Sequence, residues 1–318
     1  MKTIFIINPA AGLPKGKKSL LERIRSCIER INADADVYIT KSVGDAREYV
    51  KNYCLTIGPA RFIACGGDGT LSEVLNGAIG FEDAEIGVIP GGTGNDFCRN
   101  FGAECDFSDI MCQLSGESVE CDAIRYTTGI GSDIRQGYCV NMFNIGFDCN
   151  VADMTANMKK RPFISGSFAY FVSILFTLIK KKGADLHIEL DGKTAHKGRL
   201  LLTSLANGCY CGGGIMSNPM ACVTDGLINI NIIKNVSRLR FITLLPYYMK
   251  GALHRVRGIG RFVTTTKCKR VTITPNHGKM RLCIDGEIED AGKTEFELVP
   301  CAFRFVLPCK KTADVVCK

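Results

Sequence analysis

Apolar residues in the first hundred positions alternate between short continuous runs and stretches with helical spacing. Continuous runs are typical of strands covered on both faces of a parallel sheet, and they occur at residues 2–7, 35–40, 61–65 and 84–90. Helical spacing of apolar residues between these runs predicts helices at residues 19–31 and 45–53, and from about residue 70. Strand and helix follow one another in turn, which predicts a parallel sheet with right-handed crossovers.

The pattern changes after residue 102, where strand signals dominate up to about residue 301. Strands are predicted at residues 120–126, 138–145, 186–190, 199–206, 227–233, 237–245, 270–274, 280–284 and 294–300. Residues 237–248 fit a helix as well as a strand, and Asp-Gly pairs mark several turns. The expected fold class is an α/β domain with a parallel sheet, joined to a mostly antiparallel β domain.

A glycine-rich turn separates the third predicted strand from its helix. Gly66, Gly67 and Gly69 permit positive φ and lack the Cβ atoms that would keep a ligand away from the backbone. The helix behind them offers free N–H groups and the positive end of its dipole, which suits a phosphate. Asp68 lies inside the turn, and a carboxylate fits there if a cation accompanies the phosphates. Plain architecture explains such a turn equally often.

A second glycine-rich turn follows the fourth predicted strand. It contains Gly91, Gly92, Thr93, Gly94, Asn95 and Asp96. The carboxyl ends of parallel strands meet at one edge of a sheet, so both turns are expected to face one crevice, where ligands bind in open α/β folds. Neither turn has the spacing of a P-loop or of a dinucleotide fingerprint, so those two classes are not indicated.

Composition sets bounds on these expectations. The 318 residues suffice for one large domain or two ordinary ones, and 46% of them are apolar, enough for a sizeable core. The formal net charge is +8, from 40 Lys and Arg against 32 Asp and Glu. This excess fits a nucleotide, a phospholipid surface or a nucleic acid, and a basic solvated surface is the simpler explanation.

Seventeen cysteines are scattered along the chain. The apolar run at the start is too short for a signal peptide. An odd count without a C-x-x-C pair predicts reduced thiols in a cytosol, and neither a disulfide framework nor a zinc site.

GGDGTLSEVLNG at residues 66–77, followed by IPGGTGNDFCRNFG at residues 89–102, resembles the catalytic domain of diacylglycerol kinases and sphingosine kinases. INPAAG at residues 7–12, NIGFD at 144–148, DG at 225–226 and DGE at 285–287 occur in the same order as in the soluble bacterial lipid kinases. The first glycine motif is shared with NAD kinases, whereas the second favours lipid kinases.

This resemblance covers nearly the whole chain. It implies an α/β nucleotide-binding domain at residues 1–122, a β-rich lipid-substrate domain at residues 123–302, and an active site in the cleft between them. The tail at residues 303–318 is expected to return to the first domain.

The resemblance implies ATP as the phosphate donor, bound by loops of the first domain. The expected contacts are Asn8, Pro9, Ala10, Ala11, Gly12, Thr40, Gly66, Gly67, Asp68, Gly69, Thr70, Leu71, Ser72 and Thr93. A lysine among residues 15–18 would reach the phosphates, although a solvated loop explains these lysines equally well.

Phosphoryl transfer asks the protein mainly to position groups and to neutralise charge. Asp68 and Asp96 are expected to hold Mg²⁺, which prefers carboxylates, waters and phosphates, and the resemblance adds Asp122 to their network. A helix N-terminal acid is the alternative interpretation of Asp96. Glu287 is the expected general base; only the motif order favours it over an ordinary turn acid.

A structural Mg²⁺ is also implied at Asp225, with the backbone carbonyls of Cys222 and Leu227 as further ligands. An ordinary Asp-Gly turn is the simpler interpretation of this stretch.

The lipid substrate implies peripheral contact with a membrane surface. Residues 168–179 are apolar but too few to span a bilayer, and the basic residues on either side would suit an anionic leaflet. A buried helix explains this stretch more simply. The basic segment at residues 250–261 is the alternative docking element.

The expected activity is ATP-dependent phosphorylation of a lipid hydroxyl, with diacylglycerol giving phosphatidic acid in phospholipid biosynthesis. Three alternatives stay open: another lipid such as phosphatidylglycerol or a sphingoid base, NAD, or a non-catalytic role in binding nucleotide or lipid. The resemblance implies a cytoplasmic protein at the inner face of the membrane, without a transmembrane segment or a nucleic-acid partner, and it allows a homodimer.

Overall fold

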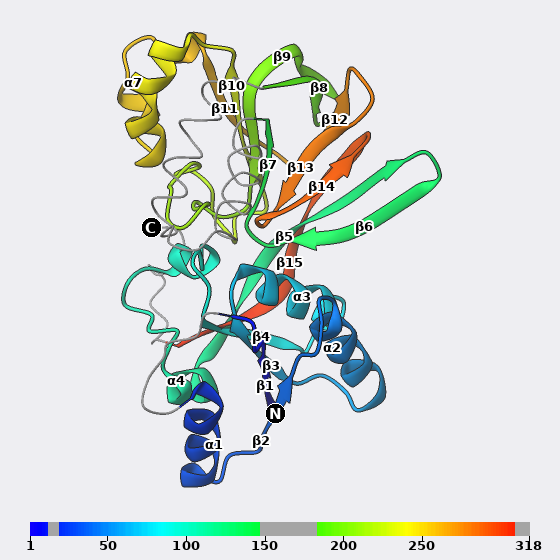
Figure 1. Cartoon of the computed structure of the whole chain (residues 1–318), viewed down its shortest axis with the longest axis vertical. Coiled ribbons are helices and arrows are strands. Elements are labelled where there is room, and N and C mark those ends of the chain that lie inside the picture. The colour runs from blue at the N-terminus through cyan, green and yellow to red at the C-terminus, as the bar shows by residue number, and fades with distance from the viewer. Residues whose placement is uncertain (12–18, 147–182, 309–318) are drawn as a thin grey trace. The chain divides into compact units, whose positions relative to one another are not determined.

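The computed structural model describes residues 1–11, 19–146 and 183–308. The chain forms two compact units (Figure 1). Unit 1 comprises residues 1–123, 223–225 and 299–318, and unit 2 comprises residues 124–222 and 226–298. The expectations for Gly12, for the lysines of the first loop and for residues 168–179 lie outside the described residues.

Unit 1 contains a parallel sheet in the order β2-β1-β3-β4-β15. Its strands are β1 (Thr3–Ile7), β2 (Ala35–Ile39), β3 (Arg61–Gly66), β4 (Glu85–Pro90) and the last part of β15 (Thr294–Leu307). Cys65 of β3 lies opposite Ile7 of β1 and Ile89 of β4. The carboxyl ends of these three strands therefore reach the same edge of the sheet, which brings the loops that follow them together.

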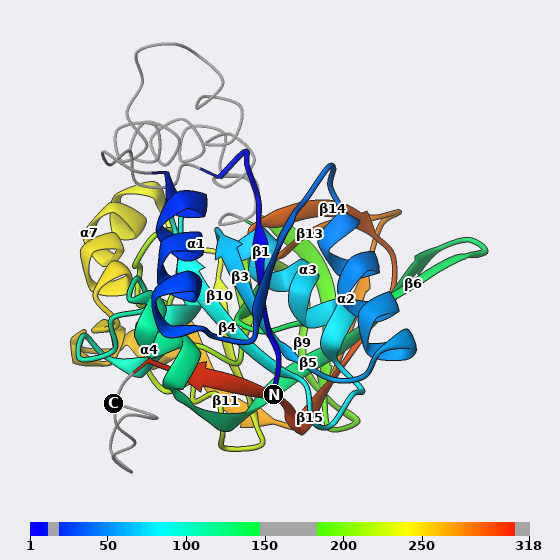
Figure 2. The ribbon, with the colours of Figure 1, turned by 90° about the horizontal axis from the view of Figure 1, so that it is seen from below.

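Helices cover both faces of this sheet (Figure 2). They are α1 (Leu20–Ile31), α2 (Asp45–Thr56), α3 (Asp68–Ala78), α4 (Ile110–Ser115) and the 3₁₀ helix η1 (Phe97–Phe101). On one face Ile24 of α1 packs with Phe5 and Ile63. On the other face Tyr53 of α2 packs edge-on against Phe62, with ring centroids 5.7 Å apart.

The sequence fixes both ends of α1. Ser19 Oγ accepts the N–H of Glu22 at 3.2 Å, and the Glu22 carboxylate accepts the N–H of Ser19 at 2.7 Å, which is a capping box. Asn32 ends the helix with φ of 50°, a left-handed conformation that Asn adopts more readily than most residues.

The helix η1 is anchored by an aromatic cluster. The rings of Phe97 and Phe101 lie 4.9 and 5.0 Å from the ring of Phe305, measured between centroids. Phe305 belongs to the part of β15 that pairs with β4. This packing holds the segment that follows the second glycine turn, because large buried aromatic rings contribute strongly to core stability.

Unit 2 is mostly antiparallel. Its strands follow the order β14-β13-β7-β9-β8-β12-β15, with β10 paired to β9 and β11 paired to β10. The strands are β5 (Glu117–Ile130), β6 (Asp133–Cys139), β7 (Met142–Gly146), β8 (Ala184–Leu190), β9 (Lys193–Ala206), β10 (Ile228–Lys234), β11 (Val263–Cys268), β12 (Arg270–Pro275), β13 (Met280–Ile284) and β14 (Glu287–Ala291). One core of buried aliphatic residues with Phe143 and Phe296 joins most of them.

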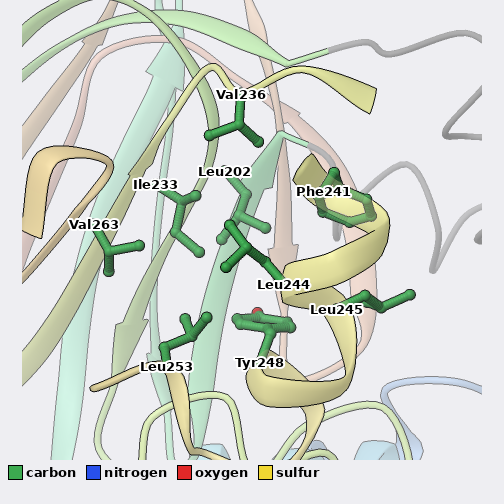
Figure 3. A pocket seen from close by; sticks show the side chains of 9 residues that line it. All are labelled: Leu202, Ile233, Val236, Phe241, Leu244, Leu245, Tyr248, Leu253 and Val263. Carbon is green, nitrogen blue, oxygen red and sulfur yellow. The ribbon is translucent and has the colours of Figure 1, made fainter. Parts of the chain in front are cut away.

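The segment that fits either strand or helix is a helix, α7 (Arg238–Met249), so the expected strand at residues 237–245 is wrong. Its N-cap is Ser237, whose Oγ accepts the N–H of Arg240 at 3.3 Å. Phe241, Leu244 and Tyr248 recur at helical spacing and face the sheet (Figure 3). Two 3₁₀ turns follow, η2 (Leu253–Arg255) and η3 (Ile259–Arg261). Within the described residues, no helix is long and apolar enough to cross a membrane.

Two further expectations are wrong. The single strand expected at residues 138–145 is divided between β6 and β7, because the Asp285 carboxylate binds the backbone N–H groups of Val140 and Asn141. Twelve described cysteines are free, but Cys105 and Cys222 are disulfide-bonded. A disulfide requires two Cα atoms within about 7 Å of each other, which the spacing of cysteines along a sequence does not reveal.

Candidate active site

The first glycine turn joins β3 to α3 at the sheet edge. Gly67 is the N-cap of α3, and the helix begins at Asp68. The first amide groups of the helix point out of its N-terminus, where the dipole favours an anion. Gly66, Gly67 and Gly69 do not have positive φ, so the expected conformational reason for these glycines is wrong.

The close approach of neighbouring atoms explains these glycines better than positive φ does. A Cβ at Gly66 would lie 2.3 Å from Thr70 Oγ1. A Cβ at Gly92 would lie only 2.6 Å from the Cα of Gly67, and one at Gly67 would lie 3.1 Å from the Cα of Gly92. The two glycine turns are therefore in direct backbone contact, and side chains would push them apart.

This contact predicts the effect of Gly92→Ala. The added methyl meets backbone that cannot move away easily, so we expect a loss of stability of about 1–3 kcal/mol and weaker nucleotide binding. Thermal unfolding followed by circular dichroism measures the first effect and titration with ATP the second. Gly260→Ala is the matched control, because nothing lies within 4 Å of its Cβ position. Equal unfolding temperatures for the two variants would contradict the contact.

Asp68 joins the two turns through hydrogen bonds. Its Oδ2 accepts the N–H of Asn95 at 2.8 Å, and its Oδ1 accepts the N–H of Asp96 at 2.9 Å. Asp96 is the N-cap of η1, but its own side chain makes no capping hydrogen bond. Asp96 therefore lies at a helix N-terminus, as its alternative interpretation expected, but the carboxylate that binds the backbone at this position is that of Asp68.

Two carboxylates converge beside Gly94. A Cβ at Gly94 would lie 2.6 Å from Asp68 Oδ2 and 3.3 Å from Asp96 Oδ2. Asp96 is 7% exposed, and its Oδ1 lies 3.5 Å from Nε of Arg99. Burial, together with the negative charges of Asp68 and Asp96, raises the pKa of the nearby Cys98 thiol. Asp68 and Asp96 thus form a small acidic corner, which suits a cation.

The loop after β1 reaches the same place. Asn8 Nδ2 donates to Thr70 Oγ1 at 3.1 Å, and Asn8 Oδ1 accepts the N–H of Ala10 at 2.9 Å. The N–H of Thr40 donates to the carbonyl of Ile7 at 2.9 Å, which places Thr40 at the end of β1. Thr93 is exposed on the second glycine turn. The structure therefore brings the loops at residues 8–11, 66–72 and 91–96 to one edge.

Asp122 lies in β5 and is 2% exposed. Its Oδ1 accepts the N–H of Cys301 at 3.0 Å, and its N–H donates to the carbonyl of Val223 at 2.7 Å. Cys301 has φ of 49°, a left-handed conformation that costs energy for a residue with a side chain. The Asp122 carboxylate therefore stabilises a turn within β15, and its part in the acidic network stays a prediction.

Two residues of unit 1 were not singled out from the sequence. Asn95 has φ of 51°; its side chain accepts the N–H of Gly92 at 3.0 Å and donates to the carbonyl of Gly92 at 2.8 Å. Glu73 accepts the N–H groups of Gly44 and Ala46 at 2.9 and 3.2 Å, which caps α2. The only signal in the sequence was an Asn after Gly94, since Asn is favoured in left-handed turns.

In unit 2 the DGE motif forms the turn between β13 and β14. Asp285 and Gly286 have φ of 46° and 100°, as in the tight two-residue hairpins that favour Asp-Gly. Glu287 is exposed at the start of β14. The turn therefore presents the Glu287 carboxylate at the surface of unit 2, and its role as general base stays a prediction.

Asp285 has a structural role that the sequence did not reveal. Its carboxylate accepts the N–H groups of Val140, Asn141 and Met142 at 2.9, 3.1 and 2.9 Å, and the thiol of Cys139 donates to it at 3.0 Å. Burial raises the pKa of the Asp285 carboxyl, and these four donors oppose that rise. The contacts lock the turn before Glu287 to the link between β6 and β7.

We expect Asp285→Ala to destabilise unit 2, because three buried N–H groups lose their acceptor at a cost of about 1–3 kcal/mol or more. Asp191→Ala is the matched control. Asp191 also has φ of 46° in an Asp-Gly turn and accepts two N–H groups, but it is exposed to water. Thermal unfolding of the two variants checks this prediction. Equal decreases in unfolding temperature would contradict the structural role of Asp285.

The stretch around Asp225 lies where the chain changes unit. Asp225 is exposed in unit 1, whereas Cys222 and Leu227 are assigned to unit 2. No group of three or more His, Cys, Asp or Glu side chains in the described ranges is arranged to hold a metal ion. Backbone carbonyls were the expected ligands here, so the second cation site stays a prediction.

Two family models match the chain. Residues 2–126 match the diacylglycerol kinase catalytic domain, and residues 141–307 match the YegS C-terminal NAD kinase beta sandwich-like domain. The diacylglycerol kinase of Bacillus subtilis strain 168 is 27% identical over 313 residues, 98% of each chain. A YegS-like lipid kinase of Pseudomonas putida is 28% identical over 298 residues, 92% of this chain and 93% of its own length.

Solved structures have the same fold. A diacylglycerol kinase from Bacillus anthracis str. Sterne aligns over 96% of both chains with a TM-score of 0.67 and 19% identity. Yeast NADH kinase aligns over 99% of this chain and 85% of its own, with a TM-score of 0.51 and 11% identity. These likenesses confirm the α/β domain and the antiparallel β domain expected from the sequence.

The second family model alone covers more than half of the chain, and the first covers the glycine turns that form the acidic corner. The chain therefore belongs to the lipid kinase family that joins a diacylglycerol kinase catalytic domain to a YegS C-terminal domain.

Proposed function

We propose that this lipid kinase transfers the γ-phosphoryl group of ATP to the free hydroxyl of diacylglycerol, giving phosphatidic acid and ADP. One observation carries the proposal: Asp68 binds the backbone of the second glycine turn while it lies at the N-terminus of α3. Acidic and anion-binding groups thus share one corner, as a nucleotide with a cation requires. Relatives named diacylglycerol kinase supply the substrate class.

The nucleotide phosphates bind at the N–H groups of the first turn of α3, from Gly67 to Thr70, with the Thr93 hydroxyl as a further donor. The next N–H, that of Leu71, already donates to the carbonyl of Gly67 at 3.1 Å. The helix dipole and the N–H groups stabilise the negative charge there. Asn8, Pro9, Ala10, Ala11 and Thr40 border the same edge and contact the nucleoside in this proposal. The hydrogen bond from Asn8 to Thr70 ties the loop after β1 to the first turn of α3.

Asp68 and Asp96 fit a magnesium ion. Mg²⁺ in phosphotransferases usually takes one or two carboxylates, with waters and substrate phosphates completing its shell. A pair of carboxylates beside Gly94 supplies this number, and the small residue leaves them room. When bound, the ion would neutralise charge that develops on the transferred phosphoryl group.

Glu287 serves as the general base in this proposal. Its carboxylate accepts the proton of the lipid hydroxyl as that oxygen forms its bond to the γ-phosphorus, and the bond between phosphorus and the bridging oxygen of ADP breaks. The anchored Asp285 fixes the direction of the turn and so orients Glu287.

The substrate also determines where the protein works. Diacylglycerol resides in a bilayer, so we propose peripheral contact with the inner leaflet of the cytoplasmic membrane. Binding of a structural Mg²⁺ by Asp225, and a share of Asp122 in the magnesium network, belong to the same proposal.

The test is phosphate transfer from γ-labelled ATP, followed by organic extraction. Separate reactions contain diacylglycerol, phosphatidylglycerol, sphingosine or NAD as the acceptor. We expect label in the organic phase with diacylglycerol, which identifies phosphatidic acid. Label transferred only to NAD, or to none of the four, would overturn the proposal, and preference for another of the lipids would correct the substrate.

A further inference from the structure

The helix α7 carries apolar residues on two opposite sides. Its inner side fills the contact with the sheet, where nine residues surround a cavity of about 20 Å³ (Figure 3). On the outer side Leu239, Ile242 and Met249 are 79%, 51% and 37% exposed. Their spacing of three and seven residues places them along one stripe. Exposed large apolar side chains gathered on one face usually mark an interaction site.

Basic residues follow this stripe in the segment after α7, whose first turn, η2, contacts the helix. Lys250 follows the last turn of α7, and Arg255, Arg257 and Arg261 lie in the η2–η3 turn, all of them exposed. Arg240 stacks its guanidinium 4.0 Å above the ring of Phe262. Among the described residues, no carboxylate lies within ion-pair distance of these four cations of residues 250–261.

The sequence shows the same asymmetry on a larger scale. Residues 226–284 contain twelve Lys and Arg and no Asp or Glu. The whole chain has a net charge of only +8, so the remaining residues are acidic overall. A positive field concentrated on one stretch, and not spread over the surface, attracts an anionic partner.

We propose that the outer face of α7 and the η2–η3 turn form the surface that docks on an anionic lipid leaflet. This α7 surface consists of Leu239, Ile242, Met249, Arg255, Arg257 and Arg261. Its apolar side chains enter the boundary between head groups and acyl chains, and its arginines bind lipid phosphates. The inference rests on the proposed function, since a lipid kinase meets its substrate in a bilayer.

The apolar stripe favours a membrane over a nucleic acid as the partner of this surface. Both partners offer phosphates to the arginines, but only the leaflet offers hydrocarbon to Leu239 and Ile242. A phosphate backbone would leave these side chains in water, where their exposure is unfavourable. Loss of binding on removal of the apolar residues, as well as on removal of the basic ones, is therefore the signature of the leaflet.

The first experiment measures co-sedimentation of the full chain with vesicles. Phosphatidylcholine vesicles are compared with vesicles that also contain phosphatidylglycerol, at low and at high salt. We expect binding only to the anionic vesicles at low salt. Arg255→Ala/Arg257→Ala/Arg261→Ala lowers the partition coefficient by about a hundredfold, since each surface cation contributes roughly a factor of five. Arg23→Ala/Arg25→Ala/Arg30→Ala on α1 is the matched control, with three exposed arginines and unchanged binding expected.

The second experiment removes the stripe. Leu239→Ser/Ile242→Ser lowers binding to the anionic vesicles by at least about tenfold, because each side chain loses its burial. The matched control is Leu55→Ser/Ile57→Ser, at residues 63% and 72% exposed in unit 1. Circular dichroism confirms that each variant is folded. Binding unchanged in both α7 variants, or lowered equally by both controls, would overturn the inference.

A third measurement separates this inference from the proposed function. Dioctanoylglycerol in neutral detergent micelles needs no anionic surface, so the triple arginine variant keeps its kinase activity there and loses it on anionic vesicles. If the triple arginine variant is active in micelles and binds vesicles as the unaltered protein does, the proposed docking role of the α7 surface is wrong, whereas the proposed function stands. If the unaltered protein binds vesicles through the α7 surface but shows no kinase activity in micelles, the proposed function is wrong, whereas the docking surface stands.

Discussion

We expect Asp68→Asn to lower turnover by a factor of about 10²–10³, the usual effect of removing one charged or hydrogen-bonding group that stabilises a transition state. The amide cannot replace the charge that would hold a cation. Its NH₂ group also faces one of the two backbone N–H groups that the carboxylate now accepts. Initial rates of phosphate transfer from ATP to diacylglycerol, measured over a range of magnesium concentrations, check this result.

Glu73→Gln separates catalysis from capping. Glu73 lies on the same helix as Asp68, and its carboxylate also accepts two backbone N–H groups, those of Gly44 and Ala46. We expect its replacement to lower the unfolding temperature while turnover stays near that of the unaltered protein. Equal losses of turnover in the two variants would mean that Asp68 acts only by holding the turns together.

Glu287→Gln is expected to lower turnover by at least about a hundredfold, within the range of general-base catalysis. Glutamine keeps the shape of the side chain but cannot take a proton. Folding and the affinity for ATP should stay unchanged, because Glu287 is exposed and the turn before it is anchored within unit 2 through Asp285. Single-turnover rates and a separate ATP titration distinguish the two effects.

Glu295→Gln is the control for this prediction, since Glu295 is another exposed carboxylate of unit 2 and forms an ion pair with Lys293 at 2.9 Å. Its turnover should match that of the unaltered protein. Near-normal turnover in Glu287→Gln would mean that Glu287 is not the general base of the reaction.

The central strands of the parallel sheet, β1, β3 and β4, were predictable because each is a short run of mostly apolar, buried residues. β1, for example, is buried at all five positions. α7 was ambiguous for the opposite reason, since apolar residues on both of its sides hide the helical period. The strand at residues 138–145 could not be divided from the sequence, because the acceptor that divides it, Asp285, is more than 140 residues away.

The candidate site shows the same limit. The sequence revealed which loops carry glycine and acid, but the glycines were expected to provide positive φ. They provide instead a backbone contact between Gly67 and Gly92, which depends on how two loops meet in space. Asp68 was selected as a cation ligand, and its hydrogen bonds to the second turn appear only in the folded chain. Tertiary contacts of this kind leave no local pattern in a sequence.

Hydrogen exchange of backbone amides, with and without a non-hydrolysable ATP analogue and Mg²⁺, tests most directly whether a nucleotide binds between the two glycine turns. The account predicts slower exchange at residues 66–72 and at residues 91–96 together, and loss of both effects in Asp68→Asn. Binding of the analogue with unchanged exchange in either turn would contradict it.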